Sequence, residues 1–436
     1  MVTQRRRTRL LTVGIAAAAA LALTSCTAGA PDSSGSDGKD SDVTLTFLVS
    51  ESPNLTPEYW DAAIARASKE VPGVKIKKVV GENTPAYAQQ LFASGQAPDI
   101  FAAGIANGLA QKGELAEYTR EELEAAGITD FTSGTINGKF YGVPTGAQAI
   151  PLVYYNKDLF EQAGITAPPA TYEELVADAA KLKAAGIAPF EIGGGGEDTW
   201  ATVLTLNALV AADVLVADPE WFLKREKDEV KFTDPEFVSA SAKVAQLVKD
   251  GFSDSAGMTR SYTDLEQAFV DGKAAMYPMG SWFTAAADSK DMTNIGVFGW
   301  PSEDGKPAFP VVTGAGMNVN ANSKNVDLAK KWALAFSVNT ENLDSTVITD
   351  GAIVTVKGYT IPDGVGGLYK QMVDAYDAAV EADATVPAWG NITGDGALPP
   401  GFNDKMIAAN VDLMTGKTSP EDFAKYLDEQ YAAAQK

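Results

Sequence analysis

The sequence predicts an α/β protein built as two lobes, each a sheet flanked by helices. Of its 436 residues, about 390 follow residue 42, which is more than one compact hydrophobic core usually holds. Apolar segments of strand length alternate with helical segments between residues 43 and 102, and the same alternation returns after residue 142. Two regions of this kind predict two sheets, each with helices on its faces.

The first region has the order β-α-β-α-β, which predicts a parallel sheet. Thr56-Pro57 marks the first helix start, because threonine caps free N–H groups and proline suits the first helical position. Thr84-Pro85 marks the second start, and Gly95 marks the end of that helix. The strands predicted here are Val43–Val49, Val74–Val80 and Pro98–Ala102.

Polar residues occupy the loops that follow the first and third of these strands. Glu51, Ser52 and Asn54 follow the first strand, and Asn107 follows the third. Ligands of such sheets bind beyond the carboxyl ends of the strands, so these four residues are candidate ligand contacts. Each one alone is compatible with a solvated loop residue, and only their convergence on one sheet edge favours a site.

The second region begins with a strand-rich segment, Gly142–Tyr155, and continues with a helix and a strand, Ile187–Ile192. A capping box, Thr171-Tyr172-Glu173-Glu174, predicts the start of that helix, which ends at Gly186. Another helix is expected from about Asp198, with Trp200 in its first turn. Further helices are predicted at Pro235–Lys249 and Tyr262–Val270.

A run of four glycines, Gly193–Gly196, follows the strand at 187–192. Glycine-rich loops can cradle phosphate, but no Gly-Lys-Ser/Thr follows this run. The run therefore predicts a flexible strand-to-helix loop and no nucleotide site.

Composition excludes several classes of function. The chain has no histidine and one cysteine, which removes Ser-His-Asp and Cys-His catalysis and histidine-based zinc sites. No EF-hand spacing is present, so we expect neither a metal ion nor a cofactor. The formal net charge is −22, which argues against nucleic acid as a partner.

The first 25 residues have the layout of a signal peptide. Four arginines precede the apolar segment Leu10–Leu23, whose 14 residues fall short of the roughly 20 that span a bilayer. Their removal would leave 31 basic and 57 acidic residues, a net charge of −26. The segment Thr27–Asp42 has no large apolar residue and predicts a flexible tether.

The only cysteine, Cys26, closes the stretch Leu23-Thr24-Ser25-Cys26. This stretch resembles the lipobox of bacterial lipoproteins. The resemblance implies cleavage before Cys26 and lipid on its thiol, so that the lipid and the tether 26–42 hold the domain after residue 42 near the outer face of a membrane. The alternative is a spectator cysteine after an ordinary signal peptide.

Several stretches resemble the extracellular sugar-binding proteins of bacterial ABC importers, the maltose-binding protein class. They keep the family order and cover essentially the whole chain after the signal peptide. They are APDI (97–100), NGKFYGVPTGAQAIPLVYYNKDLF (137–160), AGITAPPATYEELVADAAKLKAAG (163–186), QAFVDGKAAMYPMGSWF (267–283), TGAGMNVNANS (313–323) and AKKWALAF (329–336). The loop FAAGIANG after APDI lacks the tryptophan and Asp-Arg pair of the maltose binder, so those contacts do not carry over.

The resemblance implies a two-lobed, periplasmic-binding-protein-like fold in which closure of a hinge buries the ligand. Lobe one would comprise residues 43–146 plus 313–358, and lobe two residues 149–309 plus 364–436. The three crossings between lobes are expected near Thr145–Gln148, Pro310–Thr313 and Tyr359–Gly366.

The resemblance also implies a function. The chain would be a monomeric, lipid-anchored substrate-binding subunit that captures a mono- or oligosaccharide and delivers it to membrane permease subunits, without catalysis. One alternative is a tethered glycoside hydrolase, which needs two carboxylates roughly 5–10 Å apart. Another is a receptor of the same fold for peptides, polyols or chelated metal.

A sugar site needs flat aromatic rings within a polar frame. Trp282, in the GSWF match, is the first candidate for stacking, and Trp200, Trp389 and Phe402 follow; the alternative for each is a place in the core. Gln148 lies at the first crossing, where the family often has a ligand-facing carboxylate or amide, and Asp395 lies in the Trp389 loop. The remaining tryptophans are expected to be structural or simply exposed: Trp60, Trp221, Trp300 and Trp332.

Overall fold

The computed structural model describes residues 42–435 except 53, 82–83, 102–106, 130, 132–134, 254, 314–315 and 393. From Asp42 onward the chain forms one compact unit. The predictions for the signal peptide and for Cys26, and all of the tether up to residue 41, lie outside the described residues.

The first sheet has the strand order β13-β3-β1-β2. Its strand β1 (Val43–Val49) runs parallel to β2 (Val74–Val80) and to β3 (Ile100–Phe101), which confirms the predicted parallel arrangement. The fourth strand, β13 (Asn318–Val319), is antiparallel to β3 and comes from a distant part of the chain. The structure describes the third predicted strand at Ile100–Phe101, and the preceding Asp99 accepts hydrogen bonds from the N–H and Oγ1 of Thr46 at 2.7 and 2.8 Å.

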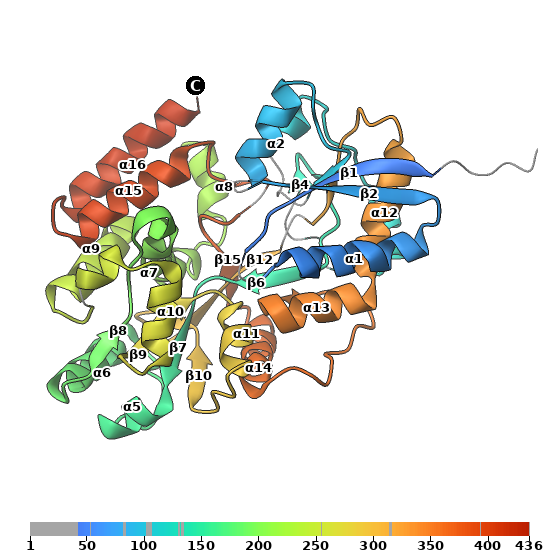
Figure 1. Cartoon of the computed structure of the whole chain (residues 1–436). Helices are drawn as coiled ribbons and strands as arrows, with labels where there is room; N and C mark the ends of the chain where they lie inside the picture. Colours follow the sequence, from blue (N-terminus) through green and yellow to red (C-terminus); the bar gives the residue numbers. More distant parts are fainter. Residues whose placement is uncertain are drawn as a thin grey trace, which may run out of the picture. The chain divides into compact units, whose positions relative to one another are not determined.

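Helices α1 (Pro57–Glu70), α2 (Thr84–Ala93), α12 (Val326–Val338) and α13 (Thr340–Asp350) accompany this sheet (Figure 1). Thr56 caps α1 as predicted, since its side chain accepts a hydrogen bond from the N–H of Tyr59. Phe47 of β1 lies at the centre of the core between sheet and helices. Aromatic rings surround it with centroids 5.4 to 5.8 Å away: Trp60, Trp332 and Phe336.

The second sheet has the order β10-β7-β9-β8. It consists of β7 (Leu152–Asn156), β8 (Ala188–Phe190), β9 (Ala274–Met279) and β10 (Ile295–Phe298). Strand β9 is buried at all six positions, as expected for the centre of a sheet covered on both faces. The helices of this part include α6 (Tyr172–Ala184), α7 (Leu204–Val210), α9 (Pro235–Lys249) and α10 (Tyr262–Val270).

A third sheet contains the first two predicted crossings. Strand β6 (Gly146–Ala149) is antiparallel to β12 (Pro307–Thr313), and Gln148 lies opposite Val312. Figure 1 shows β6, β12 and β15 (Thr385–Pro387) close together between the helices of the first and second sheets. The third predicted crossing, 359–366, has no helix or strand. The lobe boundaries themselves stay a prediction.

The remaining elements are short strands and helices around these sheets. The strands are β4 (Thr135–Ile136), β5 (Lys139–Phe140), β11 (Trp300–Pro301) and β14 (Ile353–Val354). The helices are α3 (Asn107–Gln111), α4 (Arg120–Ala125), α5 (Lys157–Gln162), η1 (Gly196–Val203), η2 (Ala211–Leu215), α8 (Trp221–Glu226), η3 (Ser255–Thr259), α11 (Phe283–Asp288), α14 (Gly367–Glu381), α15 (Phe402–Met414) and α16 (Pro420–Ala434).

One local prediction, the capping box, needs correction. The side chain of Thr171 caps α6 by accepting from the N–H of Glu174, but the Glu174 carboxylate accepts from the N–H of Ala170 instead of Thr171. The glycine run at 193–196 lies in the predicted strand-to-helix loop between β8 and the helix that begins at Gly196, and the N–H of Gly194 donates to the carbonyl of Gly257 at 3.0 Å. A methyl group at Gly193 would lie 2.1 Å from that same oxygen, so close backbone packing explains the glycines.

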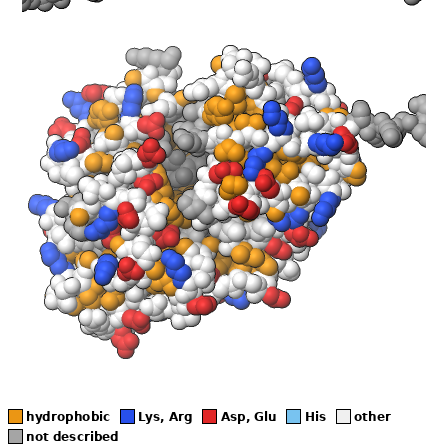
Figure 2. Space-filling model, in the orientation of Figure 1, with side chains coloured by type: hydrophobic (Ala, Val, Ile, Leu, Met, Phe, Trp, Pro, Cys, Tyr) orange, Lys and Arg blue, Asp and Glu red, His pale blue; other side chains and the backbone are white. Residues whose placement is uncertain are grey.

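The surface is acidic overall, but charges of both signs are mixed. Figure 2 shows Asp and Glu side chains interspersed with Lys and Arg over the visible face. Within the described ranges, no helix is long and apolar enough to cross a membrane. The same part of the chain contains no group of three or more His, Cys, Asp or Glu side chains placed to hold a metal ion.

Candidate functional site

Three aromatic side chains from three different segments meet beside the second sheet. The Trp200 ring lies 5.5 Å from Tyr262 and 6.1 Å from Trp282, measured between centroids. Trp200 belongs to η1, Tyr262 begins α10, and Trp282 directly precedes α11. All three are partly buried, so part of each ring stays accessible. Two of the four aromatic residues proposed from the sequence, Trp200 and Trp282, are therefore neighbours.

Hydrogen bonds to acidic residues hold these rings in place. The carboxylate of Asp198 accepts from the indole of Trp200 at 3.3 Å and from the backbone N–H of Tyr262 at 2.8 Å. The Tyr262 hydroxyl donates to Glu266 at 2.8 Å and accepts from the indole of Trp282. Burial first, and the Glu266 charge second, raise the pKa of Tyr262, so the hydroxyl stays protonated as a donor.

Gly280 makes room for the ring of Trp282. A methyl group at this position would lie 2.1 Å from the nearest ring atom, well inside van der Waals contact. The backbone bends directly after β9, and the indole folds back over Gly280. The absence of a side chain at Gly280 therefore lets the Trp282 ring take this position.

The polar part of the site centres on Asp350, the last residue of α13. Its carboxylate accepts a hydrogen bond from Nε2 of Gln148 at 2.7 Å and another from Asn54. Burial raises the pKa of Asp350 to about 7, although both hydrogen bonds act in the opposite direction. Gln148 and Asn54, both predicted from the sequence, thus converge on a carboxylate that the sequence did not reveal.

The aromatic and polar parts adjoin each other at Gly351. This residue follows Asp350 in the left-handed conformation, at φ 58°. A methyl group on Gly351 would lie 2.2 Å from the carbonyl oxygen of Ser281, the neighbour of Trp282. The charge of Asp350 also contributes to the raised pKa of Tyr262. Asp350 therefore lies within electrostatic reach of the aromatic group.

A cavity of about 430 Å³ opens at Asp350 and Gln148. Tyr59, from the start of α1, lines it, and its hydroxyl pairs with Thr346 at 2.9 Å. The other lining residues come from helices and loops beside the first sheet, from the third sheet and from the loop after β15: Ser50, Leu55, Trp60, Thr145, Gly146, Ile150, Val312, Gly316, Met317, Phe336, Ser337, Asn342, Leu343, Ala352, Val354 and Asn391. Its volume falls in the range typical of small-molecule sites.

Other residues proposed from the loops after β1 and β3 have local partners. Glu51 is exposed and forms an ion pair with Lys78 at 3.4 Å. The hydroxyl of Ser52 accepts from the N–H of Leu55 at 3.0 Å, which closes a turn. The side chain of Asn107 lies outside the described residues. Glu51 and Ser52 thus shape the loop that carries Asn54 without reaching Asp350 through any hydrogen bond described.

The structure places Trp389 and Phe402 in the hydrophobic core. Trp389 is 1 % exposed and stacks on Phe222 at 5.3 Å, and Phe402 is fully buried. Neither ring presents a free face to a sugar in this conformation, so we do not retain them as stacking residues. Asp395, from the same loop, accepts from the N–H of Asn137 at 3.1 Å and lines a separate cavity of about 420 Å³. The tryptophans expected to be structural are all buried: Trp60, Trp221, Trp300 and Trp332.

Sequence reasoning missed Asp350, Tyr262 and Tyr59 as site residues. The sequence predicts Tyr262 only as the start of a helix. The signal that could have identified it as a site residue is an aromatic side chain in the first helical position, next to the capping residue Ser261. Asp350 precedes a glycine at a helix end, where a solvated carboxylate is the ordinary expectation. No local pattern distinguishes it from the chain's many other acidic residues.

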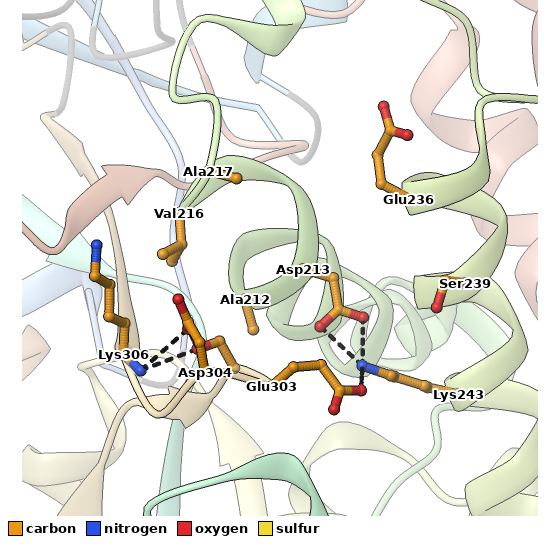
Figure 3. A pocket seen from close by; sticks show the side chains of 11 residues that line it. Ala212, Asp213, Val216, Ala217, Glu236, Ser239, Lys243, Glu303, Asp304 and Lys306 are labelled. Atoms are coloured by element: carbon orange, nitrogen blue, oxygen red, sulfur yellow. Dashed lines mark hydrogen bonds and ion pairs between the residues drawn. The ribbon is translucent and has the colours of Figure 1, made fainter.

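Another cavity, of about 370 Å³, lies among η2, α9 and the turn 302–306 (Figure 3). Lys243 points into it and is neutralised by Asp213 at 2.8 Å and Glu303 at 2.6 Å. None of the residues proposed from the sequence lines this cavity. Lys243 is already paired on two sides, and none of the described residues that line this cavity is aromatic, so we place the candidate site at Asp350 and Trp282.

Comparison with known proteins assigns the family. Residues 52–336 match the description of the bacterial extracellular solute-binding proteins, which covers well over half of the chain. The chain belongs to this family. The recognised family and the two-lobed α/β fold expected from the sequence motifs are thereby confirmed.

Relatives of this solute-binding protein include a multiple sugar-binding protein of Streptococcus mutans, 24 % identical over 75 % of the chain and 78 % of the relative. An sn-glycerol-3-phosphate-binding periplasmic protein of Rhizobium meliloti is 30 % identical over 42 % of the chain and 45 % of the relative. A binding protein of Brucella abortus is 32 % identical, and the chain spans only 37 % of its length. A chitin oligosaccharide binding protein of known structure has a TM-score of 0.78, with 26 % identity over 90 % of this chain and 99 % of that one.

Proposed function

We propose that this solute-binding protein is the substrate-binding subunit of an ABC sugar importer and that it binds a mono- or oligosaccharide. The observation that carries the proposal is the meeting of Trp200, Tyr262 and Trp282 beside Asp350. Aromatic faces stack on the C–H face of a sugar ring, and carboxylate and amide groups pair with its hydroxyls. The site combines both kinds of group within one region.

The names of the relatives support this proposal. A multiple sugar-binding protein aligns over three quarters of the chain, and a chitin oligosaccharide binding protein shares the fold over nine tenths of it. Both names describe saccharide binders. Permease subunits in the membrane, powered by a separate ATPase, would be the partners that receive the sugar.

A thermal-shift screen against mono-, di- and oligosaccharides tests the proposed function. A ligand at a hundred times its Kd stabilises the folded state by about 2.7 kcal/mol, enough to shift Tm visibly. The expected result is a shift with at least one saccharide, and no turnover of that saccharide in prolonged incubation. Hydrolysis of the bound glycan would favour the glycosidase alternative, and a shift with peptides alone would favour a receptor for another solute.

Closure of two lobes around the sugar follows from the predicted crossings. Strands β6 and β12 are neighbours in one sheet, which supports a shared hinge. Binding should make the protein more compact without changing its secondary structure. Small-angle scattering with and without the identified saccharide measures this, and an unchanged radius of gyration at saturation would contradict closure.

The lipid anchor on Cys26 is part of the same proposal. The family is extracellular, and an importer subunit must stay near its permease. Replacing Cys26 by serine should release the protein into the medium or leave it unprocessed. Membrane retention of the Cys26→Ser protein at normal mature size would argue against the lipobox.

A further inference from the structure

The charge of the candidate site restricts the class of solute. Among the described residues that line the 430 Å³ cavity, Asp350 is the only ionisable acid or base apart from the Tyr59 phenol, and none is a lysine or arginine. Asp198 and Glu266 add two more carboxylates beneath the aromatic rings. The charged side chains that line the cavity or hydrogen-bond to the aromatic residues are therefore acidic, and among the described residues the one cation whose charge acts on the wall, at Tyr59, is Arg66, which does not line it.

Three basic residues of neighbouring elements already have side-chain partners. Arg66 donates to Asn342 at 2.6 Å and to Ser345 at 3.0 Å, on the helix α13. Lys78 pairs with Asp61 at 2.7 Å in addition to its pairing with Glu51. Arg260 pairs with Glu191 at 2.6 Å. By sequence, the residues between 42 and 435 that the structure leaves undescribed include no lysine or arginine, so they supply no further cation.

The hydrogen-bonding capacity of Asp350 also favours a solute that carries hydrogen-bond donors. An ionised carboxylate offers about four acceptor positions, and Gln148 and Asn54 occupy two of them. Above its pKa of about 7 the carboxyl group is ionised, and its open positions then accept hydrogen bonds from donors on the solute. A sugar hydroxyl supplies one, whereas a phosphate dianion or a second carboxylate supplies only acceptors and a like charge.

We infer that this site selects uncharged or cationic, hydroxyl-rich glycans and rejects anionic solutes such as phosphate esters and uronic acids. The inference rests on the proposed function and narrows it. It separates the chain from the relatives whose names specify sn-glycerol 3-phosphate, because recognition of a phosphate ester calls for cationic donors. Asp350 is the residue that determines this selectivity.

Calorimetric titration with matched solutes tests the inference. The neutral probes are maltose, cellobiose and N,N′-diacetylchitobiose, and chitobiose is the cationic probe. The anionic probes are glycerol 3-phosphate, glucose 6-phosphate and digalacturonate. The wild-type protein should bind at least one neutral or cationic probe at least about a hundredfold more tightly than any anionic one. Equal or tighter binding of an anionic probe would overturn the inference and leave a role in solute binding intact.

Replacing Asp350 by asparagine keeps the size of the side chain and removes its charge. The affinity for the preferred neutral or cationic probe should fall about tenfold, and the discrimination against anionic probes should shrink by a similar factor. Asp374→Asn, an exposed change on α14, is the matched control and should alter neither value. Unchanged discrimination in Asp350→Asn would overturn the assignment of Asp350. If no glycan binds at all, while a peptide or another solute does, the proposed function fails and the inference fails with it.

Discussion

Trp282 and Trp389 are both tryptophans beside glycines in loops that follow strands, yet the fold uses them in opposite ways. Trp282 follows Gly280 and Ser281 and keeps part of its ring accessible beside Trp200. Trp389 precedes Gly390 and is 1 % exposed, stacked on Phe222. The local sequences differ little in kind. The two rings differ in what packs against them. Trp282 lies beside a few partly buried aromatic residues, whereas Trp389 is enclosed by the hydrophobic core.

The largest expected effect is the loss of stability on replacing Trp389 by alanine. Deleting a fully buried tryptophan removes its burial and leaves a cavity, which typically costs about 3–5 kcal/mol. The free energy of unfolding in urea should fall by that amount, while the fraction that stays folded binds saccharide with near-normal affinity. If Trp389→Ala had a normal free energy of unfolding but bound saccharide weakly, Trp389 would be a ligand-binding residue after all.

The next effect concerns binding through Trp282. Truncating a central aromatic anchor commonly costs about 2 kcal/mol or more, so Trp282→Ala should lower saccharide affinity at least about thirtyfold. The ligand-free protein should melt near the wild-type temperature, because the ring is only partly buried. Trp282→Phe keeps an aromatic face and loses the indole donor to Tyr262. Its affinity for the saccharide should therefore lie between that of the wild type and that of Trp282→Ala. A collapsed ligand-free melt for Trp282→Ala would mean that this ring is structural.

Replacing Gly280 by alanine tests whether the position of the Trp282 ring matters, because the change displaces the ring without removing it. The added methyl group would lie 2.1 Å from the Trp282 indole, so the ring must swing away at a cost of about 1–2 kcal/mol. We expect an affinity loss of about tenfold in Gly280→Ala, measured by calorimetry. Gly367→Ala is the control, since a methyl group at Gly367 meets nothing within 4 Å. Unchanged affinity in Gly280→Ala would show that the position of the ring is not critical.

The smallest effect is a dependence of stability on pH. The pKa of Asp350 is raised by burial to about 7, above its usual value in an unfolded chain, so the folded state binds more protons between about pH 4 and 7. Its contribution to the free energy of unfolding is therefore present below about pH 4 and decreases as the pH rises through 7. Urea unfolding of Asp350→Asn should depend less on pH over this window than the wild type does. An identical pH dependence would mean that Asp350 is not buried in solution.

Sequence patterns alone determined most of the secondary structure. Strands at 43–49 and 74–80 and helices at 235–249 and 262–270 have the predicted bounds, because apolar periodicity and capping residues act within a few positions of the chain. The parallel arrangement followed from the same alternation. The family motifs brought Trp282 and Gln148 into consideration, a first helical turn brought Trp200, and the loop after the first strand brought Asn54, so each stands in or beside a local pattern.

Only the tertiary structure decided which of these side chains share a site. Asp350 joins Gln148 across about 200 residues of chain, and its neighbour Gly351 packs against Ser281; no pattern within a few residues encodes either contact. The glycine run at 193–196 likewise depends on the distant backbone at Gly257. Burial depends on what the rest of the chain places around a residue, so the roles of Trp282, Trp389 and Asp350 were decided by packing.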